Sequence, residues 1–228
     1  METHTVNRAE RDAVALHVWF AVLATVVLAV PADVRIGWRV ALLVAAYIIA
    51  VPALAVARKH REWIGMWAFA LVLSLLQVVP DRFLAEVLGT LEFPADGVPD
   101  IGEITGYMAG LWVIPLFLVL LIGRGVDTRQ GRGPAYVAVL LTSAVLFIGA
   151  EQLMPELPAW RPVGVETIGN VALYIVPAEL LLGVATFHAF EQSRNRWVLV
   201  RVPVAVVVML LYLGTAVTSW FTIERILA

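Results

Sequence analysis

Seven long apolar stretches, separated by short loops, constrain the fold of this chain more than any other feature. A transmembrane helix needs about 20 mostly apolar residues, and these stretches are far too long for the strands of a membrane barrel. Helices also satisfy their own backbone hydrogen bonds in lipid. The sequence therefore predicts an all-α, polytopic membrane protein with seven transmembrane helices, forming one domain over residues 1–228. The predicted spans are Ala13–Val30, Gly37–Ala57, Trp63–Val79, Ile104–Gly123, Ala135–Met154, Thr167–Phe190 and Val198–Ile223.

The composition supports a membrane protein and excludes several function classes. Of the 228 residues, 61% are hydrophobic and only 15% are charged, whereas a soluble domain usually has about 25% charged residues. The net charge of −2 provides no basic field for nucleic acid, so no nucleic-acid partner is expected. The chain has no cysteine, which excludes thiol catalysis, disulfides and cysteine-ligated iron–sulfur clusters.

The distribution of basic residues predicts the orientation in the membrane. Eleven arginines and lysines lie at the set of span ends that includes the N-terminal segment, and five lie at the opposite set. By the positive-inside rule, the N-terminus is expected in the cytoplasm and the C-terminus outside. Glu10 and Asp12 are unlike a positively charged leader, so the first stretch is expected to be a retained span and not a signal peptide. We expect an integral protein of the cytoplasmic membrane of a prokaryote.

The one long loop, Pro80–Glu103, lies between spans three and four on the outer side. Its first half, Asp81–Glu92, places apolar residues on one helical stripe. This pattern predicts a short interfacial or re-entrant helix that caps the bundle. The sequence shows no internal repeat and no second domain.

Glu179 is the sharpest candidate for chemistry, because it lies near the middle of the sixth predicted span. A charge at that depth costs about 2.5–3.5 kcal/mol even on lenient insertion scales. Glu179 is therefore expected to face the bundle, to find a hydrogen-bond donor or to stay protonated. Pro177 is expected to kink the helix beside it. The alternative is that Glu179 makes one interhelical hydrogen bond that locks the packing.

Other polar residues gather toward the outer ends of the predicted spans. Glu166, Asn170 and Tyr174 are spaced four residues apart and are predicted to share one helix face. Glu151 ends span five on the same side, and Gln77 and Asp81 end span three there. We interpret these residues as the lining of a polar outer cavity. The alternative is that helix ends at the membrane interface are simply hydrated.

Acids in the loop before span four permit two interpretations. The spacing of Asp96 and Asp100, with Glu103 nearby, resembles an aspartate pair that holds magnesium on a diphosphate. Asp100 and Glu103 also fit a capping box at the start of a helix, which is the favoured reading.

Span four carries small and aromatic residues that suggest packing and a pocket wall. Gly102, Gly106 and Gly110 recur every four residues, which predicts close approach of another helix. Tyr107 and Trp112 are candidate pocket residues.

Absent motifs narrow the possibilities further. The chain has no zinc-protease helix motif, nucleophile elbow, phosphate-binding loop or dinucleotide fingerprint. The seventh span has no lysine, so it cannot hold retinal as a Schiff base. No cofactor is expected.

The chain resembles the small seven-helix membrane cyclases of isoprenoid metabolism, which include the fungal meroterpenoid cyclases and the lycopene cyclase-type membrane domains. The segment Pro177-Ala178-Glu179-Leu180 is similar to the P-x-E-E patch of lycopene cyclase domains, with Leu180 in place of the second glutamate. The resemblance implies a membrane-embedded enzyme acting on an isoprenoid or another lipid, such as an acid-initiated cyclase or isomerase. A carboxylic acid would protonate an epoxide or alkene, and aromatic faces with a second carboxylate would stabilise the carbocation.

On this hypothesis the catalytic candidates are Glu179, Glu151 and Glu166. The candidate substrate-binding residues are Asn170, Tyr174, Tyr107, Trp112, Gln77 and Asp81. The expected partners are the lipid bilayer and a hydrophobic small-molecule substrate, and no oligomeric state follows from the sequence.

Two alternatives remain open: a small transporter or proton or cation channel, and a non-catalytic membrane scaffold. An apolar pocket with a few acids would favour the enzyme, a polar tunnel the transporter, and a solid core the scaffold.

Overall fold

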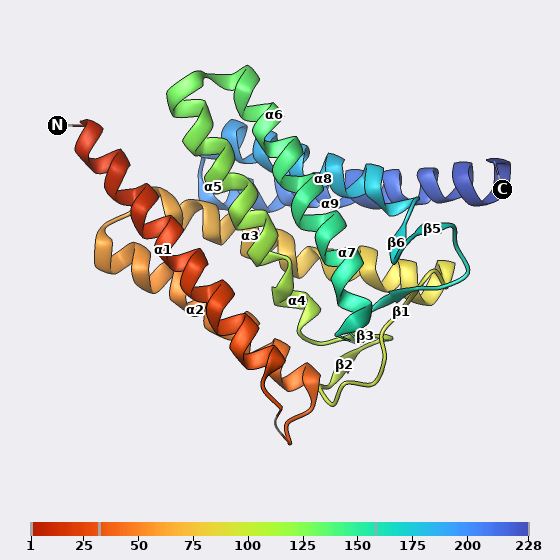
Figure 1. The fold of residues 1–228 in the computed structure, drawn as a ribbon. Coiled ribbons are helices and arrows are strands. Elements are labelled where there is room, and N and C mark those ends of the chain that lie inside the picture. Colours follow the sequence, from red (N-terminus) through yellow and green to blue (C-terminus); the bar gives the residue numbers. More distant parts are fainter. Residues whose placement is uncertain (1, 32, 158, 228) are drawn as a thin grey trace.

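The computed structural model describes residues 2–31, 33–157 and 159–227 and confirms the prediction of an all-α fold (Figure 1). The α-helices are α1 (Glu2–Ala29), α2 (Ile36–Arg58), α3 (Arg61–Arg82), α4 (Met108–Leu111), α5 (Val113–Gln130), α6 (Arg132–Ser143), α7 (Gly149–Leu153), α8 (Ile175–Ser193) and α9 (Val198–Phe221). Short π-helical segments extend or join them at η1 (Phe83–Leu88), η2 (Ala144–Ile148) and η4 (Thr222–Leu227), and η3 (Met154–Glu156) is a 3₁₀ turn. The strands are β1 (Leu91–Glu92), β2 (Asp100–Ile101), β3 (Ile104–Thr105), β4 (Arg161–Pro162), β5 (Thr167–Ile168) and β6 (Val171–Ala172).

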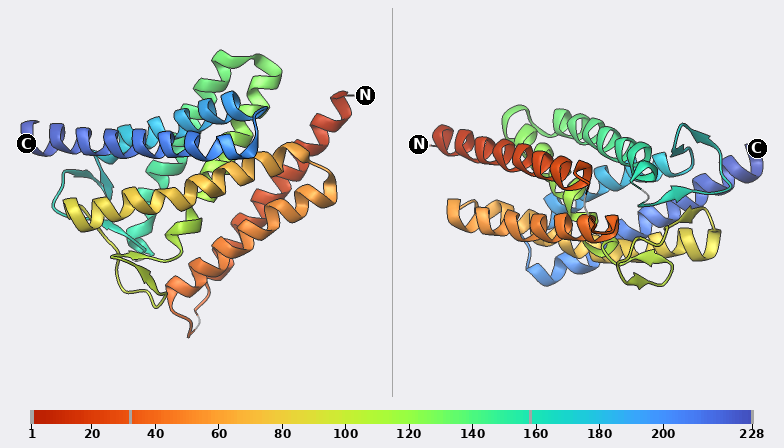
Figure 2. Two further views of the ribbon diagram at one scale, coloured as in Figure 1. Left: turned by 180° about the vertical axis from the view of Figure 1, so that it is seen from behind. Right: turned by 60° about the horizontal axis from the view of Figure 1, so that its bottom comes forward.

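Within the described residues, six helical segments are long and apolar enough to cross a membrane. They comprise α1 from Arg8, α2, α3 with η1, α4 with α5, α6 through η3, and α9 with η4. The α8 helix packs in the same bundle but is not among these six segments, and it carries the polar residues Glu179, His188 and Glu191. The strands gather at the end of the bundle away from the N-terminus (Figures 1 and 2).

Two of the predicted spans begin too early, because their first residues form β-hairpins. The prediction started span four at Ile104 and span six at Thr167, whereas the helices start at Met108 and Ile175. Apolar residues of a two-residue strand read like the first turn of a helix when only hydrophobicity is considered. The polar stripe predicted for Glu166, Asn170 and Tyr174 is therefore wrong, since these residues do not lie on one helix.

The predicted interfacial helix over Asp81–Glu92 is also wrong. α3 continues to Arg82 and then through the π-helical turn η1 without leaving its axis, as the backbone angles of Arg82 and Phe83 are helical. The chain leaves the helix at Gly89, which has φ 63°. Leu84 and Ala85 of this segment are buried in the bundle, whereas Val87 is 64% exposed.

The two hairpins have the same design, so the structure contains an internal repeat that the sequence analysis missed. In β2–β3 Ile101 pairs with Ile104, and in β5–β6 Ile168 pairs with Val171. Both turns carry a glycine at positive φ, 69° at Gly102 and 63° at Gly169, a conformation that favours glycine. The segments Asp100-Ile-Gly-Glu-Ile-Thr-Gly-Tyr107 and Thr167-Ile-Gly-Asn-Val-Ala-Leu-Tyr174 share only three identical residues, which is too little to stand out in the sequence.

Each hairpin is also held by the helix that precedes it. The Glu86 carboxylate accepts a hydrogen bond from the backbone N–H of Glu103 at 3.1 Å. The Gln152 side-chain oxygen accepts one from the N–H of Asn170 at 3.2 Å. One repeat unit therefore runs from α3 to α5 and the other from α6 to α8. Strands β1 and β4, one from each unit, pair antiparallel with each other.

The core lies where α3, α5, α8 and α9 pack together, and α1 lies at the edge of the bundle against α2 (Figure 2). Close approach depends on glycine at several positions, among them Gly110 and Gly123. A side chain at Gly110 would meet Val44 and Ile48 of α2, as predicted for this glycine, whereas Gly102 and Gly106 lie outside the helix. A side chain at Gly123 in α5 would meet Phe187 and Val139 at 2.7 Å.

Comparison of two glycines in α5 tests this packing. We expect Gly123→Ala to destabilise the protein by about 1–3 kcal/mol through overpacking, partly offset by the better helix propensity of alanine. Gly125→Ala is the matched control, because a side chain there meets nothing within 4 Å. Thermal unfolding in detergent should give a lower midpoint for Gly123→Ala than for Gly125→Ala, and equal midpoints would contradict the close packing.

The end of the bundle near the α5–α6 turn carries a network of ion pairs centred on Arg124. Its guanidinium lies 2.6 Å from Glu62 of α3 and 3.3 Å from Glu191 of α8. The Glu191 side chain is only 2% exposed and also pairs with Arg132 of α6 at 2.8 Å. The network thus ties four helices together where the apolar core ends.

Removing Arg124 should be costly, because it leaves a buried carboxylate with fewer partners. We expect Arg124→Gln to lower the free energy of unfolding by about 3 kcal/mol. The control is Arg161→Gln, whose partner Glu92 and own side chain are 47% and 57% exposed, and which should cost less than about 1 kcal/mol. Unfolding by SDS titration of mixed micelles measures both, and a similar loss in the two variants would argue against the role of burial.

Candidate functional site

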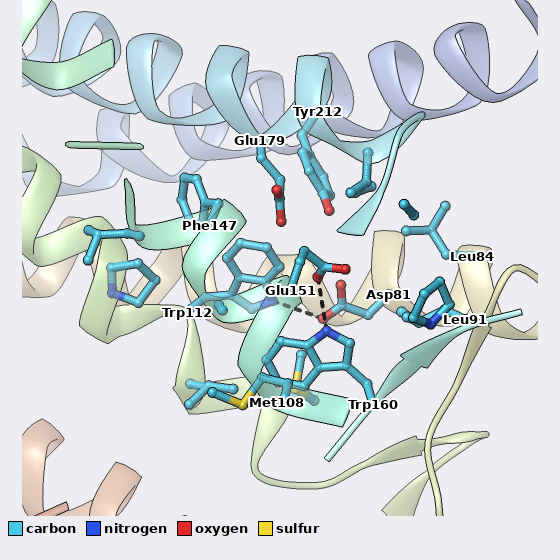
Figure 3. A pocket seen from close by; sticks show the side chains of 18 of the residues that line it. Asp81, Leu84, Leu91, Met108, Trp112, Phe147, Glu151, Trp160, Glu179 and Tyr212 are labelled. Carbon is cyan, nitrogen blue, oxygen red and sulfur yellow. Dashed lines mark hydrogen bonds between the residues drawn. The ribbon is translucent and has the colours of Figure 1, made fainter. Parts of the chain in front are cut away.

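A cavity of about 240 Å³ lies under the β1–β4 pair, between the two repeat units (Figure 3). Its walls come from the ends of α3 and η2–α7, the beginnings of α4–α5 and α8, and the middle of α9. Most of the side chains that line it are apolar. The polar groups among them are Asp81, Thr90, Trp112, Glu151, Trp160, Tyr174, Glu179 and Tyr212.

Three carboxyl groups point into this cavity from three different helices. Asp81 of α3, Glu151 of α7 and Glu179 of α8 are exposed by only 2%, 7% and 3%. Figure 3 shows the three side chains converging on the same space. Such a cluster is expensive to bury, because each carboxylate loses its hydration and opposes the others.

Two indole groups provide hydrogen bonds to two of the three carboxyls. The Trp112 indole N–H donates to Asp81 Oδ2 at 2.9 Å, and the Trp160 indole N–H donates to Glu151 Oε1 at 2.9 Å (Figure 3). Trp112 lies at the junction of α4 and α5, and Trp160 immediately precedes β4. Each indole is therefore positioned by a break in the regular structure.

Glu179 differs from the other two acids, because its Oε2 atom has no hydrogen-bond partner among the described residues. The sequence analysis placed Glu179 at mid-helix beside a kink at Pro177. In the structure α8 begins at Ile175, so Pro177 lies in the first turn, where a missing backbone N–H costs little. The predicted kink is wrong, and Glu179 lies one turn into the helix instead of at its centre.

The internal repeat relates Glu179 to Trp112. Each is the fifth residue after the tyrosine that precedes its helix, Tyr107 in the first unit and Tyr174 in the second. The first unit thus places an indole donor where the second places a carboxyl group. The cavity lies where these two non-identical positions face Asp81 and Glu151.

Aromatic rings line the cavity beside the three carboxyl groups. Trp112 packs against Tyr212 with ring centroids 5.8 Å apart and against Phe147 at 5.7 Å. The hydroxyls of Tyr174 and Thr90 are 2.8 Å apart, which joins the wall to the segment before β1. Sequence analysis missed Tyr212, Phe147, Trp160 and Thr90. The tyrosine in the middle of the apolar run of α9 was the one available signal.

The structure brings together five of the residues singled out from the sequence: Asp81, Trp112, Glu151, Tyr174 and Glu179. The other candidates lie outside the cavity. Glu166 is exposed before β5, where its backbone N–H donates to Glu224, and Asn170 in the β5–β6 turn bonds to Gln152. Both were placed in the cavity on the assumption of a longer sixth helix.

Gln77 and Tyr107 are buried but do not line the cavity. Gln77 lies one turn before Asp81 in α3, and its amide has no partner among the described side chains and backbone groups. Burial and the nearby Asp96 raise the pKa of Tyr107 above its ordinary value.

The acids of the long loop are occupied in other ways. Asp96 is buried and accepts hydrogen bonds from the N–H of Val98 at 2.9 Å and the hydroxyl of Thr105 at 3.0 Å. Asp100 pairs in β2, so the capping box predicted for Asp100 and Glu103 is wrong. Within the described ranges no group of three or more acidic or histidine side chains is arranged to hold a metal ion.

Comparison with protein families gives one match. A family described as a domain of unknown function, DUF6989, matches residues 78–223. The chain belongs to the DUF6989 family. The matched region begins near the end of α3 and includes every residue that lines the cavity, whereas α1 and α2 lie outside it. No curated protein and no solved structure matches this DUF6989 chain.

The pairing of Trp112 with Asp81 can be tested by a double-mutant cycle. Trp112→Phe keeps an aromatic ring but removes the donor, so we expect a loss of about 1–3 kcal/mol from the unsatisfied carboxyl. In the Asp81→Leu background the same change should cost much less. Unfolding in detergent measures both steps, and additive losses would show that the hydrogen bond is unimportant.

Proposed function

We propose that this DUF6989 protein is a membrane-embedded enzyme that protonates an isoprenoid or another lipid and so starts its isomerisation or cyclisation. The supporting observation is the small apolar cavity into which three carboxyl groups point, only two of them held by indole N–H groups. A structural cluster of acids would be expected to have its donors complete. An acid without a donor in an apolar enclosure is suited to give its proton to a poor base.

The proposed roles follow from the hydrogen bonds. Glu179 is the proton donor, because its Oε2 atom is unpartnered and faces the cavity. Asp81 and Glu151 accept the proton that the carbocation loses at the end of the reaction, since an indole N–H stabilises each of them as a carboxylate. The faces of Trp112, Tyr212 and Phe147 are placed to stabilise a cation between these acids.

The reaction balances without an oxidant or reductant. Glu179 transfers a proton to one carbon of an alkene, whose π electrons form the new C–H bond and leave a cation on the adjacent carbon. Loss of a proton from a neighbouring carbon to Asp81 or Glu151 restores a double bond at a new position. If a second double bond attacks the cation first, a C–C bond forms and a ring closes. The proton then returns to Glu179 through the acid cluster.

The lining supports this proposal over the two alternatives. A transporter would be expected to have a polar path through the bundle, and a scaffold would need no cavity. The cavity here is mainly apolar, with its carboxyl groups confined to one end of the bundle. Its volume is slightly below the range of about 300–1,000 Å³ usual for small-molecule sites.

The membrane topology that goes with this proposal has seven crossings, with α8 as the sixth crossing in chain order. The N-terminus would be cytoplasmic and the strands and C-terminus external, as the basic residues suggest. Glu179 and the side chain of Glu191 would then be shielded from lipid, because both are almost fully buried and α6 and α9 pack on α8.

Replacing the proposed proton donor tests the function. Glu179→Gln keeps the shape of the side chain, and we expect it to lower formation of the product lipid by about 100-fold or more, as for loss of a general acid. Glu166→Gln is the control, because Glu166 lies outside the cavity. Mass spectrometry of lipid extracts from cells with and without each variant provides the measurement. An unchanged lipid profile on expression of the unaltered protein would count against an enzyme.

A further inference from the structure

The residues that line the cavity fall into a buried set and a half-buried set, and the half-buried set is entirely apolar. The carboxyl, indole and phenol groups all belong to the buried set. The half-buried members are Leu91, Leu111, Ile114, Pro115, Leu146, Ala150, Met154 and Pro162. The cavity is therefore exposed only along apolar side chains.

Six of these eight half-buried residues mark two facing walls, and the other two, Leu91 and Pro162, belong to the β1–β4 pair. Leu111, Ile114 and Pro115 lie along α4 and the start of α5. Leu146, Ala150 and Met154 are spaced four residues apart along η2, α7 and η3, so they form one stripe. α5 packs closely on α6, whereas neither α4 nor α5 makes comparable contact with α7 in the described parts of the chain. The cavity thus reaches the surface between these two walls.

The strand end of the cavity is closed by the pairing of the two repeat units. Leu91 of β1 lies opposite Pro162 of β4, and the N–H of Val163 donates to the carbonyl of Thr90 at 3.0 Å. The Thr90 hydroxyl in turn contacts the Tyr174 hydroxyl. Access from water at this end would require these polar contacts to break, whereas the two walls are joined by apolar contacts such as that of Trp112 with Phe147, whose ring centroids lie 5.7 Å apart.

The surroundings of the opening indicate what it faces. On the same helical segment Val145 is 74% exposed and Leu153 is 59% exposed. Both belong to a segment that is apolar enough to cross a membrane. Apolar side chains exposed at this level of a membrane protein contact lipid tails. Exposed apolar side chains therefore flank the cavity on this side.

We propose that the cavity opens sideways into the bilayer between α4–α5 and η2–α7, and that the substrate is a membrane lipid whose apolar chain extends through this opening. Only its reactive end would lie among Asp81, Glu151 and Glu179. A volume of about 240 Å³ is smaller than that of a drug-sized ligand site, so a long-chain lipid does not fit inside whole. This inference rests on the proposed function for the identity of the ligand as substrate.

Photolabelling in vesicles tests the opening without requiring turnover. The protein is reconstituted in phosphatidylcholine vesicles containing a prenol or, separately, a fatty alcohol, each with a diazirine at one end. We expect labelled peptides from the cavity wall. Ala150→Trp and Ile114→Trp, which narrow the opening from opposite sides, should each lower this labelling about tenfold, equivalent to a clash of about 1.4 kcal/mol. Val145→Trp, in the neighbouring lipid-facing position, should leave it unchanged.

A spin label on Ala150→Cys provides a test that does not depend on the tryptophan variants folding, and the chain has no other cysteine to label. Its relaxation should be enhanced by oxygen, which dissolves in lipid, more than by a water-soluble nickel chelate. Adding prenol should slow its motion. Stronger relaxation by the nickel chelate would place the opening in water and overturn the proposal.

The outcomes separate this inference from the proposed chemistry. Undiminished labelling of the cavity wall in both folded tryptophan variants would overturn the lateral opening, even if Glu179→Gln is inactive. Labelling that depends on Ala150 and Ile114, together with normal product formation by Glu179→Gln, would support the opening and overturn the role of Glu179. Labelling by the prenol alone would indicate an isoprenoid ligand. Labelling by both probes would indicate that a general acyl chain is also accepted.

Discussion

The structure depends on one constraint: three carboxyl groups are enclosed by hydrocarbon and need either donors or a proton. Facing lipid, each would be costly. Asp81, Glu151 and Glu179 are instead turned toward one another inside the bundle, and two of them receive an indole N–H. The donors have to be rigidly placed to be useful. Trp112 is therefore fixed at a helix junction and Trp160 next to a strand that pairs across the repeat.

The internal repeat explains how such a site arises from a simple bundle. Two units of helix, hairpin and helix meet at the β1–β4 pair, and their equivalent positions face one cavity. Were the units identical, the cavity would be symmetric, with matching groups on both sides. Trp112 occupies this position in one unit and Glu179 occupies the equivalent position in the other, so the two sides of the cavity are chemically different. A donor that holds a carboxylate and an acid free to give a proton are the two parts that proton-initiated chemistry needs.

The enclosure and the proposed opening would both serve the proposed chemistry. A carbocation formed in water is captured at once, so a site of this kind has to exclude water during reaction. The paired strands close the end of the cavity that lies nearest the aqueous phase in the proposed topology, and the half-buried part of its lining is apolar. A lipid approaching through the side of the bundle brings no water with it. The small volume then limits which part of the chain meets the acids.

The sequence by itself determined the all-α architecture with apolar helices long enough to span a membrane, and it selected Asp81, Glu151 and Glu179 as candidates, because a stretch of apolar residues and an acid within it have few physical outcomes in lipid. It did not determine where α4 and α8 begin, since a short strand and a helix turn look alike in hydrophobicity. That error placed Glu166 and Asn170 in the site. Only the tertiary structure decided which acids meet, which indoles bind them and where the cavity opens, because these depend on contacts between residues such as Trp160 and Glu151 or Leu91 and Pro162, which no periodicity along one helix records.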